Sequence, residues 1–173
     1  MSAQEQMLEQ FVAYLVDRLR GAGVFSDRQP STNVHETEAY IGTSDRWLLH
    51  LVVSGPRVIL SALDPATCAW QDHNIDSLAD LDACFPGIAA AARDVMRQLT
   101  VYSLEKGRRY RIARDFTDFF GNCFAAGEEL VFESRDFLPY EDGHTLHFKG
   151  RGMWIKGGSE PYARFGLLVE PAD

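Results

Sequence analysis

Hydrophobic residues recur at helical spacing in two segments of the first hundred residues. In the first segment, from about residue 3 to about residue 20, the apolar positions are Met7, Leu8, Phe11, Val12, Leu15 and Leu19. Polar residues lie between them, and glycines follow at positions 21 and 23, so this segment predicts one amphipathic helix. The second segment predicts another helix, with Pro86 near its first turn. Its apolar positions are Ile88, Ala91, Ala92, Val95 and Leu99.

The residues between these helices predict an antiparallel hairpin. Residues 47–53 are apolar on both faces, which is typical of a central strand covered on each side. A turn over 54–57 and a second apolar run over 58–63 complete the hairpin. Weaker strand patterns lie near residues 38–41 and 67–72. Ser77 and Asp80 predict the cap of a short helical turn before the second helix.

From about Leu104 onward the hydrophobic period changes to two. Short alternating runs separated by glycine-containing turns predict five strands and a small bent sheet or open barrel. The runs lie around residues 110–112, 130–132, 145–148, 153–155 and 165–169. The chain is therefore expected to be an α+β protein with two parts, an α+β half over 1–102 and a small all-β domain over 103–173.

The second part also carries a recognisable block of residues. It contains Gly127-Glu128 and then Phe137-Leu138-Pro139-Tyr140-Glu141-Asp142-Gly143-His144-Thr145-Leu146. Residues 104–170 resemble an uncharacterised bacterial family of unknown function, in which a block F-L-P-Y-[DE]-D-G-x-T-L follows a strand. His144 stands where that family usually has an apolar residue. The resemblance supports a fold boundary and offers no activity that could be carried over to this chain. The block itself predicts a rigid turn, with Phe137, Leu138 and Tyr140 packed onto the sheet.

Charge narrows the kinds of partner. The chain has a formal net charge of −8, which makes nucleic acid an unlikely partner because phosphate binding needs a basic surface. Residues 1–100 hold 7 Lys and Arg against 13 Asp and Glu, a net charge of −6. The acidic excess therefore belongs mostly to the first half.

Apolar runs and cysteine spacing indicate where in the cell the protein is expected. No apolar run is long enough for a membrane span, and the polar first ten residues do not resemble a secretory leader. Cys68, Cys84 and Cys123 form neither a disulfide framework nor a zinc motif. We therefore expect a cytoplasmic protein without membrane association; the sequence leaves its oligomeric state open.

No catalytic or cofactor motif is found. His144 and His147 lie at an odd offset on one expected strand, which places them on opposite faces, and His35 with Glu36 and Glu38 lies in a polar loop. Nucleophile elbows, phosphate-binding loops and zinc spacings are absent from the sequence. We therefore expect no metal and no cofactor, and an enzyme is disfavoured.

One basic segment, Lys106–Arg114, offers a nucleic-acid or small-ligand site. Its candidate binding residues are Arg109, Arg111 and Tyr140. The competing interpretation is that Arg109 and Arg111 pair across strands with Glu129 and Glu133, which would neutralise the segment.

The acidic residues of the first half give the leading functional hypothesis. They would form a docking face for a basic protein, with Trp70 as an aromatic anchor. The candidate partner-binding residues are Asp64, Trp70, Asp72, Asp76, Asp80 and Asp82. The most concrete form of this hypothesis is an immunity-type protein that inhibits a basic partner without catalysing a reaction. The alternative is a ligand-binding module that uses the Lys106–Arg114 strand.

Overall fold

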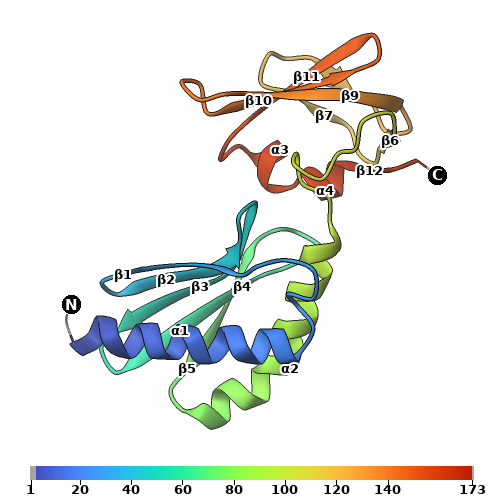
Figure 1. Ribbon diagram of the computed structural model, residues 1–173. Helices are drawn as coiled ribbons and strands as arrows, with labels where there is room; N and C mark the ends of the chain where they lie inside the picture. The colour runs from blue at the N-terminus through green and yellow to red at the C-terminus, as the bar shows by residue number, and fades with distance from the viewer. Residues whose placement is uncertain (1–2, 173) are drawn as a thin grey trace. The chain divides into compact units, whose positions relative to one another are not determined.

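The computed structural model describes residues 3–172 and has an α+β fold. The chain separates into two compact units, Met1–Arg97 and Gln98–Asp173. The change of hydrophobic period that the sequence shows near residue 103 lies a few residues after this division. Figure 1 shows the two helices of the first unit and the strand-rich second unit.

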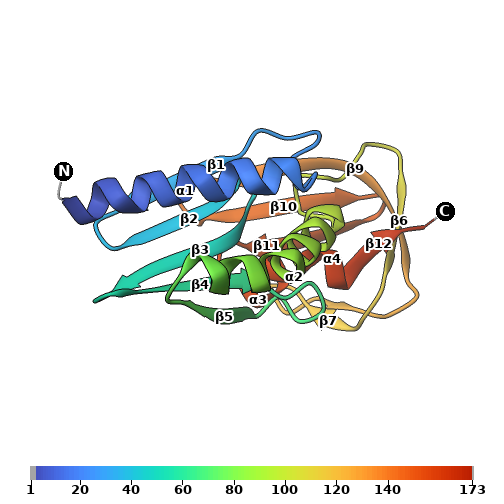
Figure 2. The same cartoon turned by 90° about the horizontal axis from the view of Figure 1, so that it is seen from below.

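The first unit is a five-stranded antiparallel sheet covered on one face by two helices (Figures 1 and 2). Its elements are α1 (Ala3–Gly21), β1 (Ser31–His35), β2 (Glu38–Thr43), β3 (Arg46–Ser54), β4 (Arg57–Leu63), β5 (Trp70–Ile75) and α2 (Leu78–Arg97). The strands follow one another in chain order across the sheet. Helix α1 packs on β1 and β2, and α2 packs on β3, β4 and β5.

Alternation along the strands decides which face the helices cover. Leu49, Leu51 and Leu60 point toward the helices and are fully buried, together with Leu15 and Leu81 from the helices themselves. Removing such apolar surface from water is the main source of stability of a layered unit. The opposite face of the sheet has no helix from this unit over it. We call it the open face.

The second unit has a five-stranded sheet in the order β11-β10-β9-β6-β12 and a separate two-stranded ribbon, β7-β8. Its elements are β6 (Arg109–Ile112), β7 (Phe116–Thr117), β8 (Cys123–Phe124), β9 (Glu129–Leu138), β10 (Gly143–Phe148), β11 (Arg151–Lys156), α3 (Glu160–Ala163), α4 (Phe165–Leu168) and β12 (Val169–Pro171). All sheet pairs are antiparallel. Its own core includes Tyr110, Phe124 and Phe165, each fully buried. The sheets are open and do not close into a barrel.

Three sequence-based expectations need correction. The segment Phe165–Val169 is not a strand, because Phe165–Leu168 forms the short helix α4 and the strand β12 begins at Val169. The helix expected near Ile88 already begins at Leu78 and continues through Pro86. Its start coincides with the predicted cap, since the Ser77 hydroxyl donates to the Asp80 carboxylate at 2.8 Å.

The third correction concerns the turn after β9. Phe137, Leu138 and Tyr140 were expected to pack onto the sheet, but all three side chains are exposed. The buried residue of this segment is His144, which is 2% exposed. Of the three exposed side chains, Phe137 keeps a contact with the sheet, since its ring centroid lies 4.9 Å from that of His144 on β10.

Candidate functional site

The open face of the first sheet carries a group of aromatic side chains. We call Tyr40, Trp47, His50 and Trp70 the aromatic face. The Tyr40 and His50 rings stack with centroids 4.3 Å apart and an interplanar angle of 11°. The Trp47 ring lies 5.6 Å from Tyr40, and the Trp70 ring lies 6.1 Å from His50. The four rings thus form a continuous band from β2 across β3 to β5.

Strand register produces this band. Tyr40 lies opposite His50, His50 lies opposite Ser61, and Trp70 lies opposite Leu63 on the neighbouring strand. Directly opposed residues share a face of an antiparallel sheet, so all of these side chains point away from the helices. Trp47 and Trp70 keep 38% and 42% of their surface exposed. Large exposed aromatic side chains are typical anchors of protein interfaces.

A β-bulge is needed to bring Trp47 into the band. The register of β2 and β3 shifts between Ile41 and Gly42, so Leu48 and Leu49 are both buried and Trp47 returns to the open face. The bend brings backbone close to Gly42, where an added Cβ would lie 2.2 Å from the Arg46 carbonyl oxygen. Glycine at this position therefore permits the arrangement.

Two carboxylates border the aromatic face. Glu38 lies on β2, and its Oε2 is 3.6 Å from Nε2 of His50. That nitrogen is buried and makes no hydrogen bond. Asp72 lies on β5 two residues after Trp70 and accepts a hydrogen bond of 2.6 Å from the Ser61 hydroxyl. The face therefore combines exposed aromatic rings with negative charge.

The other predicted acids have local partners in separate places. The Asp76 carboxylate pairs with Arg57 at 3.3 Å, and Asp82 pairs with Arg18 of α1. Asp80 caps the start of α2. The predicted acids do not form one cluster; of the six partner-binding candidates, Trp70 and Asp72 are the pair that lies on the open face.

Asp64 lies in the loop after β4. It accepts hydrogen bonds of 2.8 Å from the backbone N–H of Ala66 and from the side chain of Gln71. The Ala66 hydrogen bond lowers the pKa of the Asp64 carboxyl below its usual value. This acid therefore stays ionised while it shapes its own loop.

The alternative site in the second unit is dispersed. Nη2 of Arg111 lies 3.1 Å from Glu129, and Nη1 of Arg109 lies 3.6 Å from the same residue. Arg111 also approaches Glu170 at 3.7 Å. Cross-strand pairing thus neutralises part of the basic segment. Tyr140 follows the other end of the ten-residue strand β9, roughly 30 Å from Glu129 at the usual strand rise.

A buried histidine lies at one end of the second unit's core. Nε2 of His144 is 3.3 Å from the Tyr102 hydroxyl, and its ring stacks on Tyr162 with centroids 5.8 Å apart. Nδ1 of His144 is buried without a hydrogen-bond partner. Burial, and then the charge of Arg135, lower the pKa of His144 below its usual value. This side chain is neutral at pH 7 and completes an aromatic cluster.

The sequence predicts no binding or catalytic role for Asp118, nor for the residues of the aromatic face other than Trp70. Asp118 is only 6% exposed and accepts backbone hydrogen bonds from Phe120, Asn122 and Trp154. Phe119 and Phe120 beside it are exposed and contact the Trp154 ring. An Asp followed by Gly121 and Asn122 signals a turn, but its link to β11 depends on tertiary structure.

Residues 3–172 offer neither a metal cluster nor a membrane-spanning helix. No group of three or more His, Cys, Asp and Glu side chains in this range could hold a metal ion. No helix in the same range is both long and apolar enough to cross a membrane.

Part of the chain matches a known protein family. Residues 96–156 match a family described as a domain of unknown function (DUF3601). The resemblance of this region to an uncharacterised domain family is thus confirmed at that level, while the Phe137–Leu146 block stays a prediction. A comparison with curated proteins found no match. Among solved structures, an integron cassette protein from the mobile metagenome of Vibrio cholerae, VCH_CASS4, is 22% identical, with 43% of this chain and 95% of that chain covered and a TM-score of 0.39.

Proposed function

We propose that this chain is a non-enzymatic protein-binding protein whose first unit docks on a basic protein through the aromatic face with Glu38 and Asp72. The observation that carries the proposal is the band of rings with its two exposed tryptophans, bordered by carboxylates. In its most concrete form, the protein is an immunity-type inhibitor that covers the cationic site of its partner. Such a protein acts in the cytoplasm and needs no cofactor.

The chemistry of the face favours a cationic partner. An Arg or Lys side chain over a tryptophan or tyrosine ring is attracted by the ring's quadrupole, and a neighbouring carboxylate adds a charge-assisted hydrogen bond. Within residues 31–75, the structure places Arg57 at a corner of the open face, where Asp76 pairs with it. Arg46, the other Lys or Arg residue within 31–75, donates a hydrogen bond to Val95 of α2 on the opposite side of the sheet. No cation of this range therefore occupies the middle of the open face, which leaves the aromatic rings and carboxylates accessible to a partner's cation. The net charge of −6 over residues 1–100 would also speed association with a basic protein.

Arginine should be preferred over lysine at this face. A guanidinium group is planar, stacks on aromatic rings and pairs with a carboxylate through two N–H groups. An ammonium group offers a more strongly hydrated point charge. A surface that used charge alone would not distinguish the two.

Isothermal titration calorimetry with two peptide probes, decaarginine and decalysine, tests the proposal. We expect decaarginine to bind at least about fivefold more tightly than decalysine, and both to weaken as salt rises. Trp70→Ala and Asp72→Asn should each weaken decaarginine binding by about fivefold or more. Asp94→Asn on α2 is the matched control, since it removes an exposed charge that pairs with Arg97 away from this face.

Equal losses of decaarginine affinity in Asp72→Asn and Asp94→Asn would show that net charge alone attracts the peptide, and would contradict the proposal. Equal affinities for the two peptides would contradict it as well. Unchanged binding in Trp70→Ala would remove the aromatic face from the site.

A further inference from the structure

Strand β1 is an unpaired edge of the first sheet. It pairs with β2 on one side, and the sheet order ends with it. The two-residue turn between them closes on the His35–Glu38 pair. Because hydrogen-bonded pairs alternate along an antiparallel ladder, Thr32 and Val34 direct their backbone N–H and C=O groups away from β2. This edge can therefore accept another strand.

The edge lacks the usual devices that prevent strand addition. Proteins protect edges with lysine or proline inside the strand, with bulges or with very short strands. The sequence of β1 is STNVH, without charge or proline, and its register with β2 is regular over all five pairs. Proline occurs just before the strand, at position 30. An additional strand would meet no steric or charge barrier along β1 itself.

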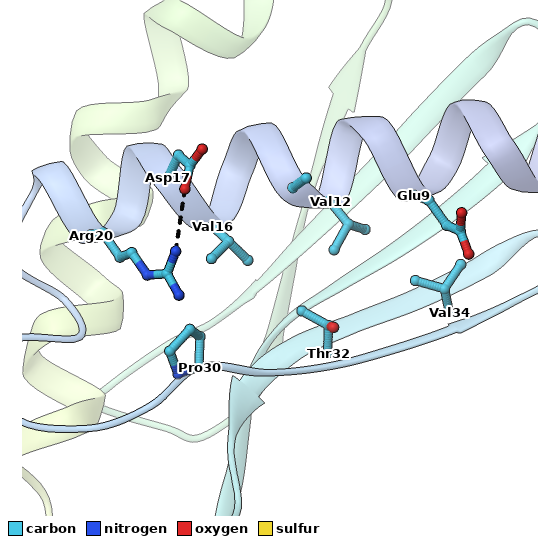
Figure 3. A pocket seen from close by; sticks show the side chains of 9 residues that line it. Glu9, Val12, Val16, Asp17, Arg20, Pro30, Thr32 and Val34 are labelled. Carbon is cyan, nitrogen blue, oxygen red and sulfur yellow. Dashed lines mark hydrogen bonds and ion pairs between the residues drawn. The ribbon is translucent and has the colours of Figure 1, made fainter.

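A groove runs beside this edge, between α1 and β1 (Figure 3). Its volume is about 440 Å³, and its lining residues are Glu9, Val12, Ala13, Val16, Asp17, Arg20, Pro30, Thr32 and Val34. Thr32 is exposed although it lies on the helix-covered face, because α1 does not extend over the edge. The floor is apolar, and the charged side chains lie along the helix rim.

One end of the groove carries Glu9, and the other carries Arg20, whose guanidinium also pairs with Asp17 of the same helix at 3.3 Å. Figure 3 shows Glu9 next to Val34 at one end, and Arg20 next to Pro30 at the other. A half-turn about an axis through the middle of the groove exchanges these ends. Glu9 of one molecule would then face Arg20 of a second molecule, twice in the same complex. A surface that is complementary to itself in this way is typical of a two-fold symmetric dimer.

The helix and the strand define the same axis. Glu9 and Arg20 are eleven residues apart on α1, about 16 Å at the helical rise. Pro30 and Val34 are four residues apart, about 13 Å along an extended strand. The midpoint of the strand pair is Thr32, so both pairs can share one two-fold axis near that residue.

We infer that β1 is the site where a second copy of this chain adds, so that two β1 strands pair antiparallel about Thr32 and join the two sheets. In this dimer Val34 lies opposite the partner's Pro30. Proline lacks an N–H but keeps its C=O, which can accept from Val34. The two α1 helices lie side by side, with Ala13 facing the partner's Val16 and Glu9 facing the partner's Arg20. The open face that carries Trp47 and Trp70 remains free.

Light scattering coupled to size-exclusion chromatography tests the inference on the full chain. The wild-type protein should have twice the chain mass of 19.4 kDa at micromolar concentration. Glu9→Arg and Arg20→Glu should each weaken the dimer at least about tenfold, because like charges then face each other twice. The double variant Glu9→Arg with Arg20→Glu should restore the dimer. Asp94→Arg on α2 is the control and should leave the mass unchanged.

Thr32→Lys gives a second, independent variant. Thr32 is exposed, so the monomer should keep its fold, which far-ultraviolet circular dichroism checks. The change places two ammonium groups together on the axis and should give a monomer. The inference is overturned by a monomeric wild-type protein, by single variants that remain dimeric, or by a double variant that stays monomeric. A dimeric Thr32→Lys protein would overturn it equally.

Discussion

Replacing Asp118 with alanine measures how strongly one buried carboxylate stabilises the second unit. Asp118 lies between β7 and β8, and its carboxylate accepts four hydrogen bonds. Two donors are backbone N–H groups, that of Trp154 at 3.1 Å and that of Phe120 at 3.0 Å. Asn122 supplies the other two, its backbone N–H at 2.9 Å and its side-chain amide at 3.0 Å. These bonds tie the exposed residues 119–122 to Trp154, a buried residue of strand β11.

The expected loss follows from what happens to each donor. The Trp154 N–H is in a buried residue, so losing its charged acceptor should cost about 2 kcal/mol. Phe120 and Asn122 are in an exposed loop, where water replaces the lost acceptor, and each should cost about 0.5 kcal/mol. The sum is about 3 kcal/mol. Asp118→Asn keeps one acceptor oxygen and should lose about half of that.

Urea unfolding followed through the indole N–H signal of Trp154 in NMR spectra gives the free energy of unfolding of the second unit separately from the first. Asp115→Ala is the control, because Asp115 accepts one exposed backbone hydrogen bond, from Ala126 at 2.7 Å. That change should cost less than about 1 kcal/mol. A loss in Asp118→Ala no larger than in Asp115→Ala would refute the assignment of Asp118 as the anchor of the loop.

Three further predictions concern single positions. Burial and Arg135 lower the pKa of His144, so the unfolded chain binds a proton at this residue more readily than the folded chain does. The free energy of unfolding of the second unit should therefore be full above pH 6.5 and fall as the pH drops below it. His144→Phe should flatten this pH dependence of the urea midpoint. An unchanged pH dependence of the urea midpoint in His144→Phe would exclude His144 as its source. Gly42→Ala should destabilise the first unit by about 2 kcal/mol, because its Cβ meets the Arg46 carbonyl oxygen; an unchanged urea midpoint would contradict this. Pro86→Ala should raise the thermal midpoint of the first unit by supplying the missing helical N–H, and a lower midpoint would contradict that reasoning.

Much of the first unit could be predicted because its pattern is local. The helix expected over about 3–20 is α1, and the hairpin expected over 47–53 and 58–63 is β3 with β4. Strand β1 could not be predicted, because an edge strand that is half exposed needs no apolar alternation, and STNVH has none. Pro86 obscured the first turns of α2, where burial of Leu81 and Phe85 outweighs the cost of proline in a helix.

The candidate site was less accessible from sequence. Trp70 and Asp72 could be singled out because they are neighbours in one acidic segment. Tyr40, Trp47 and His50 come from two other strands, and only the register and the bulge at Gly42 bring them onto the same face. Alternation along neighbouring strands predicted that Arg109 and Arg111 pair with Glu129 and Glu133, and the structure pairs both arginines with Glu129. A shared site of these arginines with Tyr140 depends on distances between strand ends, which alternation does not provide.

An NMR titration of the full chain with decaarginine, observing the three tryptophan indole signals, tests directly whether a cationic partner docks on the open face. Two of these residues, Trp47 and Trp70, lie on the aromatic face, and Trp154 belongs to the second unit. The Trp47 and Trp70 signals should shift together and saturate at the same peptide concentration, while the Trp154 signal stays in place. Shifts of the Trp154 signal without shifts of the other two, or no saturable shift of Trp47 and Trp70, would contradict a docking site on the open face.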